Sequence, residues 1–138
     1  MVRVDYQYSL NYRELEAGSF PVLQVRITRP DNPDLGIDTD VYLDSGAERS
    51  LFNGDLLAAL ETDLINNSSI LYGSTFGDTV TGYLHGVLLT VSEVGDFNLE
   101  IGFSDRQIRR NLLGRDFFNL VQIGFREHQR QYYLNSVP

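Results

Sequence analysis

The chain has 138 residues, no cysteine and a formal net charge of −8 at pH 7. This length predicts one domain over residues 1–138, and the lack of cysteine excludes disulfides, thiolate nucleophiles and cysteine-bound metals. The balance of 11 basic against 19 acidic residues argues against nucleic-acid binding, because proteins that contact the phosphate backbone normally present a basic face. No apolar leader or membrane-spanning run is visible, so we expect a cytoplasmic protein that does not contact a membrane.

Alternating apolar and polar residues near the start of the chain predict a β-hairpin. Residues 20–28 form the first expected strand, in which every second residue is apolar and faces the core. Segment 30–34, rich in proline and aspartate, is typical of a turn, and residues 38–43 form the second expected strand. The residues expected on the buried face of the first strand are Leu23, Val25 and Ile27.

A short helix is expected to follow this hairpin. Asn53 is a residue type that caps free backbone amides, and Asp55 suits the positive end of a helix. Leucines then recur at helical spacing, so one face of the helix should pack on the core. These leucines are Leu56, Leu57, Leu60 and Leu64.

The rest of the chain indicates further strands separated by turns. The expected strands lie within residues 69–94, with a turn at 73–78, and at 97–103, 120–125 and 132–134. Short strands with turn signals at regular intervals predict an all-β fold, closed or sandwiched.

The strongest local signal for chemistry is the segment Asp44-Ser45-Gly46-Ala47, which follows the apolar strand 41–43. Carboxylates rarely end apolar strands unless they are paired or hydrogen-bonded. The small residues after Asp44 allow a backbone or a partner chain to approach closely. A strand-end aspartate that merely caps a turn is the alternative interpretation.

A second signal lies 70 positions later, where the apolar pair Leu112-Leu113 runs into Gly114-Arg115-Asp116 and a short aromatic segment. The first motif resembles the Asp-Thr/Ser-Gly-Ala active-site motif of retroviral-type aspartic proteases, the retropepsins. The second resembles the apolar-apolar-Gly-Arg-Asn/Asp motif of the same family. The strands expected at 120–125 and 132–134 would form an extra C-terminal hairpin, which resembles cellular and bacterial members of the family more than viral ones.

This resemblance implies a fold, an assembly and a set of residue roles. The fold would be a single-domain, all-β, retropepsin-like closed barrel with one or two short helices, and the protein would be a homodimer. Asp44 would be the catalytic residue, and Ser45 would hydrogen-bond across to the other half of the active site. Gly46 and Ala47 would line the cleft with backbone groups. Glu48, where the family usually has aspartate, would pair with Arg115.

The resemblance also implies a flap formed by the hairpin of residues 73–82, and no cofactor or metal. Its tip and the cleft would include Ser74, Thr75, Phe76, Gly77, Asp78, Leu112 and Leu113. We expect the cleft to prefer apolar side chains, since the positions around Asp44 are apolar.

One copy of the Asp-Ser-Gly motif cannot supply the two carboxylates that aspartic-protease chemistry requires. We therefore expect an aspartic endopeptidase that hydrolyses peptide bonds at a dyad of two Asp44 residues, one from each subunit of a symmetric homodimer. The main alternative is a non-catalytic peptide-binding or dimerisation module on the same fold. A glycosidase would need a second nearby carboxylate in the same chain, and none stands out.

Three further patterns favour ordinary structural roles. Asp38 and Asp40 could suggest a metal site, but they are typical of solvent-facing strand positions. A catalytic triad of Ser45, His85 and an aspartate would be expected to carry a Gly-x-Ser-x-Gly elbow around the serine, and Ser45 has none. The basic cluster Arg106, Arg109 and Arg110 is interpreted as a solvated face.

Overall fold

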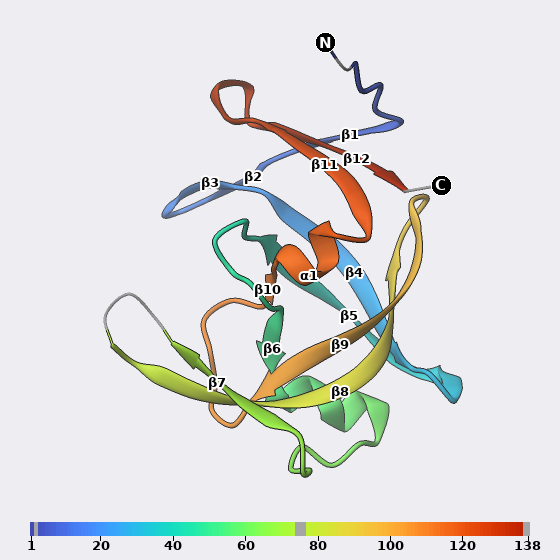
Figure 1. The fold of residues 1–138 in the computed structure, drawn as a ribbon, viewed down its shortest axis with the longest axis vertical. Helices are drawn as coiled ribbons and strands as arrows, with labels where there is room; N and C mark the ends of the chain where they lie inside the picture. Colours follow the sequence, from blue (N-terminus) through green and yellow to red (C-terminus); the bar gives the residue numbers. More distant parts are fainter. Residues whose placement is uncertain (2, 74–76, 137–138) are drawn as a thin grey trace.

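The structure is a computed structural model that describes residues 1, 3–73 and 77–136. It consists mainly of strands, with two 3-10 segments and one turn of α-helix (Figure 1). The elements are β1 (Tyr8–Asn11), β2 (Arg13–Leu15), β3 (Gly18–Phe20), β4 (Val22–Arg29), β5 (Asn32–Leu43), β6 (Leu51–Asn53), η1 (Gly54–Leu60), β7 (Ser69–Gly73), β8 (Thr79–Val91), β9 (Gly95–Ser104), β10 (Leu112–Leu113), α1 (Arg115–Phe118), β11 (Val121–Arg126), η2 (Glu127–Gln129) and β12 (Gln131–Ser136). The expected mostly-β fold is confirmed.

The largest sheet closes on itself. Its strand order is β4-β5-β10-β6-β9-β8-β7, and a further pairing joins β4 to β8 through Arg26–Thr28 and Leu88–Thr90. This pairing completes a hydrogen-bonded ring through β4, β5, β10, β6, β9 and β8. Closure removes the exposed edges that open sheets must protect from unwanted pairing.

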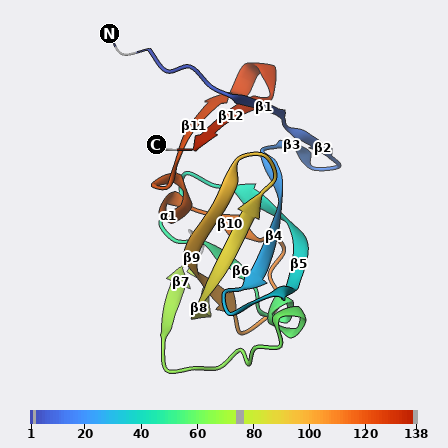
Figure 2. The same ribbon diagram turned by 90° about the vertical axis from the view of Figure 1, so that its right-hand side faces the viewer.

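A small sheet of order β1-β12-β11 lies at one end of the molecule, beyond the large sheet (Figure 2). The ends of the chain therefore meet in one sheet, with Tyr8 opposite Leu134. The buried Tyr132 hydroxyl donates a hydrogen bond of 3.0 Å to the Val22 carbonyl, which ties this sheet to β4.

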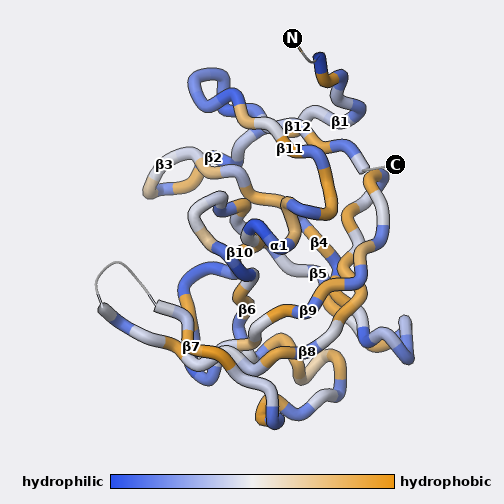
Figure 3. The backbone as a smooth tube through the Cα atoms, viewed as in Figure 1, coloured by the Kyte–Doolittle hydropathy of each residue, from blue (hydrophilic) through white to orange (hydrophobic). Residues whose placement is uncertain are grey.

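One core fills the space between the sheet faces. Apolar segments run along β4, β8 and β9, where they alternate with polar ones (Figure 3). The three residues expected to share the buried face of β4 are at most 4% exposed, which confirms that prediction: Leu23, Val25 and Ile27. Leu57 and Leu60 of η1 are buried in the same core, as predicted. Leu56 and Leu64, expected on the same helix face, are only partly buried, and Leu64 lies beyond the end of η1.

Three sequence-based expectations differ from the structure. β5 starts at Asn32, inside the segment expected to be a turn, because the hairpin turns in only two residues after Arg29. Strands β1 to β3 were not expected. The side chain of Asn53 does not cap η1; instead it exchanges two hydrogen bonds of 2.9 Å with the backbone of Ile108. Within the described ranges, no helix is long and apolar enough to cross a membrane.

Candidate active site

The most important placement in the fold is that of β10, which brings the two sequence motifs side by side. Leu112 and Leu113 pair in parallel with Tyr42 and Leu43 of β5, and Leu112 also pairs with Leu51 of β6. The Asp44 N–H donates to the Leu113 carbonyl over 2.9 Å. A segment 70 positions away in sequence therefore holds the end of the strand that carries Asp44.

The loop after β5 fixes the Asp44 carboxylate. Its Oδ1 accepts a hydrogen bond of 2.9 Å from the Gly46 N–H, and the Ala47 N–H donates to the Asp44 carbonyl over 3.2 Å. The Asp44 side chain is half-buried, whereas Ser45 and Gly46 are exposed. The turn therefore presents a carboxylate whose orientation is set by the backbone.

Gly114 allows the second motif to pack directly against this loop. A Cβ atom at Gly114 would lie 2.5 Å from the Ala47 carbonyl oxygen, so any side chain would collide with the backbone. The close approach lets the Arg115 N–H donate to that same carbonyl over 2.8 Å. Glycine is required here because of space, not because of a special backbone angle.

Ser50 and Asp116 form the main polar link between the motifs; the sequence pattern contained Asp116 without giving it a role and did not single out Ser50. Ser50 is fully buried; its N–H and hydroxyl donate to the two oxygens of Asp116 over 2.9 and 2.7 Å. The Gly114 N–H in turn donates to Ser50 Oγ over 3.0 Å. Charge-assisted hydrogen bonds of this kind are stronger than neutral ones. The only sequence signal for this link was that Asp116 ends the second motif and Ser50 lies three residues after the first.

The pairing expected between Glu48 and Arg115 is wrong for the isolated chain. Both side chains are exposed, and no ion pair joins them in the part of the chain that the structure describes. The physical reason is that Asp116, one position further along, already supplies the carboxylate that ties α1 to the active-site loop.

An open groove of about 680 Å³ adjoins Asp44. Its lining comes from the active-site loop, from β7 and from the start of β6 and β10: Asp44, Gly46, Ala47, Glu48, Arg49, Leu51, Ile70, Leu71, Tyr72, Gly73 and Leu112. Leu112 lines the groove as expected. Leu113 does not, because adjacent strand residues point to opposite faces and Leu113 is fully buried in the core. Leu43, the residue before Asp44, is also buried in the core.

Tyr72 connects the wall of the groove to the active-site loop. Its ring packs over Gly82 and Gly102, and its hydroxyl donates to the Ser50 carbonyl over 3.0 Å. Burial, followed by the negative charge of Asp116, raises the pKa of Tyr72 to about 12. The phenol therefore remains protonated, and remains a hydrogen-bond donor, throughout the physiological range.

The hairpin expected to be a flap is present as the pair β7 and β8, with Gly73 opposite Thr79. Gly77 and Asp78 near its turn are exposed, and Gly77 has a φ of 85°, a conformation that favours glycine. The expected tip residues Ser74, Thr75 and Phe76 lie outside the described residues.

The competing site interpretations receive no support from their surroundings. His85 Nε2 lies 2.8 Å from the Leu64 carbonyl, and its ring packs against Phe103, so its contacts are not with Ser45.

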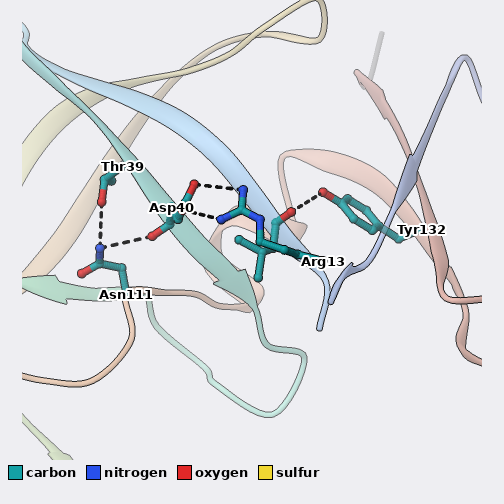
Figure 4. Close-up of polar contacts among 6 residues, drawn as sticks. Arg13, Thr39, Asp40, Asn111 and Tyr132 are labelled. Atoms are coloured by element: carbon teal, nitrogen blue, oxygen red, sulfur yellow. Dashed lines mark hydrogen bonds and ion pairs between the residues drawn. The ribbon is translucent and has the colours of Figure 1, made fainter. Parts of the chain in front are cut away.

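The two strand carboxylates are paired with arginines. Asp38 pairs with Arg26 over 3.3 Å. Asp40 accepts two hydrogen bonds from Arg13, as Figure 4 shows. The same view shows Asn111 bonded to Thr39 and to the Asp40 carbonyl, which anchors the segment before β10.

Comparison with known proteins gives structural matches only. No protein-family model matches the sequence, and no curated protein matches it. A retropepsin-like aspartic protease from Rickettsia conorii superimposes with a TM-score of 0.59 and 12% identity, covering 99% of this chain and all of that one. EIAV protease, solved in complex with an inhibitor, superimposes with a TM-score of 0.55 and 20% identity, covering 72% of this chain and 86% of the viral one. The chain therefore has the fold of the retropepsin-like aspartic proteases.

Proposed function

We propose that this protein is an aspartic endopeptidase that acts as a homodimer, with one Asp44 from each subunit forming the catalytic pair. The observation that carries the proposal is the position of the Asp44 carboxylate and the groups around it. It lies beside an open groove, it is oriented by the Gly46 N–H, and no basic side chain neutralises it among the described residues. A carboxylate with only a structural role would normally have a charged partner or a full set of donors.

The chemistry follows from placing two such carboxyl groups together. Two neighbouring carboxylates do not both ionise readily, so they share one proton. The ionised member takes a proton from a bound water, and that water attacks the carbonyl carbon of the scissile peptide. The protonated member donates to the carbonyl oxygen as the tetrahedral intermediate forms. One chain supplies a single Asp-Ser-Gly motif, so the monomer is inactive in this scheme.

The groove supports a peptide as the substrate. Apolar side chains from β6, β7 and β10 line it, so apolar substrate residues would be buried there. Tyr72 fixes β7 to the Ser50 carbonyl, which leaves the more distant part of the hairpin as the segment that would close over bound peptide.

Digestion of casein and of a mixed peptide library between pH 4 and 7 tests the proposal, with Asp44→Asn as the matched variant. Asparagine keeps the oxygen that accepts from the Gly46 N–H, so the variant should fold normally while losing cleavage by a factor of at least about 10³. Light scattering on both proteins reports the oligomeric state. A dimer that binds peptides but cleaves none would instead establish the non-catalytic peptide-binding module, and a strict monomer would refute the dyad.

A further inference from the structure

Arg110 is held between two aromatic rings beside the active-site strand. Its guanidinium carbon lies 4.6 Å from the centroid of Phe20 and 4.6 Å from that of Tyr42. The two rings are themselves 5.7 Å apart, so the three side chains form one cluster. Cation–π contacts of this kind favour arginine, because its planar guanidinium stacks on ring faces. We refer to Arg110, Phe20 and Tyr42 as the arginine cluster.

The arginine cluster lies close to the catalytic candidate along the chain. Tyr42 lies at the end of β5 and precedes Asp44 by two positions, a spacing of about 6–7 Å between Cα atoms in extended chain. The Tyr42 N–H donates to the Asn111 carbonyl over 2.8 Å, and Tyr42 pairs with Leu112. Leu112 lines the groove, and Arg110 precedes it by two residues. Tyr42 and Arg110 are therefore the neighbours, across the sheet and along the chain, of a residue that lines the groove.

The charge of Arg110 has no protein counter-ion in the described part of the chain. Two arginines that contact β5 do have one, since Arg13 pairs with Asp40 and Arg26 with Asp38. Arg110 forms none of the ion pairs seen and is only partly exposed. Stacking on ring faces leaves the N–H groups at the edge of the guanidinium available as donors, in a geometry that matches a carboxylate.

We propose that Arg110 is a specificity-determining residue that binds an acidic side chain of a peptide substrate, aspartate or glutamate, at the subsite next to Leu112. This inference rests on the proposed peptidase function. The net charge of −8 opposes acidic peptides at long range, but salt screens such repulsion beyond roughly 8–10 Å. Direct contact with a preorganised guanidinium decides the preference at this one position.

Matched peptides test the proposal. A cleavable peptide from the library is resynthesised with glutamate or glutamine at each position on either side of the scissile bond. The wild-type protein should favour glutamate at one position by about 10- to 100-fold in kcat/KM. Arg110→Met, which keeps a long unbranched side chain beside the two rings but removes the charge, should lose that preference for glutamate over glutamine. Arg109→Met, at an exposed neighbouring position, should retain the preference.

A charge-reversal variant and a peptide-binding assay distinguish failure of this proposal from failure of the peptidase proposal. Arg110→Glu should favour lysine over glutamine at the same position. The proposal is overturned if the glutamate preference is absent from the wild type or survives in Arg110→Met, or if Arg110→Met converts a dimer to a monomer. Should the wild type cleave no peptide, fluorescence anisotropy with labelled glutamate and glutamine peptides gives the same comparison without catalysis. A preference for glutamate that depends on Arg110 would then support the subsite although the peptidase proposal had failed.

Discussion

Replacing Ser50 with alanine tests whether the link between the two motifs is as strong as its geometry indicates. Ser50 Oγ donates to Asp116 over 2.7 Å and accepts from the Gly114 N–H over 3.0 Å, in a site with no solvent exposure. Alanine removes both interactions but keeps the bond from the Ser50 N–H to Asp116. The substitution therefore isolates the contribution of the hydroxyl.

Two terms give the expected magnitude. Loss of a hydrogen bond to a charged acceptor costs about 1.5–3 kcal/mol, and leaving the buried Gly114 N–H without a partner costs about 1–3 kcal/mol. These terms are not independent, because Gly114 and Asp116 are adjacent and relax together. We expect Ser50→Ala to lower the free energy of unfolding by about 3 kcal/mol, which is a large effect for one hydroxyl.

Urea denaturation followed by circular dichroism measures the change. Both proteins are compared at the same concentration, because dimerisation would make the apparent stability depend on it. The control is Ser92→Ala, an exposed serine in the turn between β8 and β9, which should change stability by less than about 0.5 kcal/mol. A loss in Ser50→Ala below about 1 kcal/mol would refute the argument that this hydroxyl holds the motifs together.

Two further predictions concern tyrosines. Gly102→Ala should destabilise the protein by about 1–3 kcal/mol in thermal unfolding, because the added Cβ would collide with the Tyr72 hydroxyl oxygen. The control is Gly86→Ala, whose added Cβ would meet no atom within 4 Å. Equal effects of the two substitutions would contradict the reasoning. Burial raises the pKa of Tyr132 from 10.0 to about 12, so its contribution is complete below pH 10 and is lost as the pH rises toward 12. This alkaline loss of stability amounts to about 2–3 kcal/mol. Denaturant midpoints measured between pH 9.5 and 11.5 should therefore fall less steeply in Tyr132→Phe than in the wild type. Parallel curves for the two proteins would exclude a contribution from Tyr132.

The sequence alone determined the features that depend on local pattern. Strict alternation in Leu23, Val25 and Ile27 predicted the buried face of β4, because the period of two in a strand allows only one such face. Asp44-Ser45-Gly46-Ala47 and Leu112-Leu113-Gly114-Arg115 pointed to the retropepsin-like fold, and the structural matches confirm that fold. They also selected Gly46, which orients Asp44, and Leu112, which lines the groove.

Only the tertiary structure decided which polar groups meet. Asn53 looked like a helix cap, but it binds Ile108, 55 positions away, and the carboxylate that anchors the active-site loop belongs to Asp116 rather than Glu48. Arg110 looked like part of a solvated face, yet it lies between two aromatic rings, one from β3 and one from β5. Periodicity reports which way a side chain points, whereas hydrogen-bond and stacking partners depend on how distant strands pair, and no local pattern encodes that pairing.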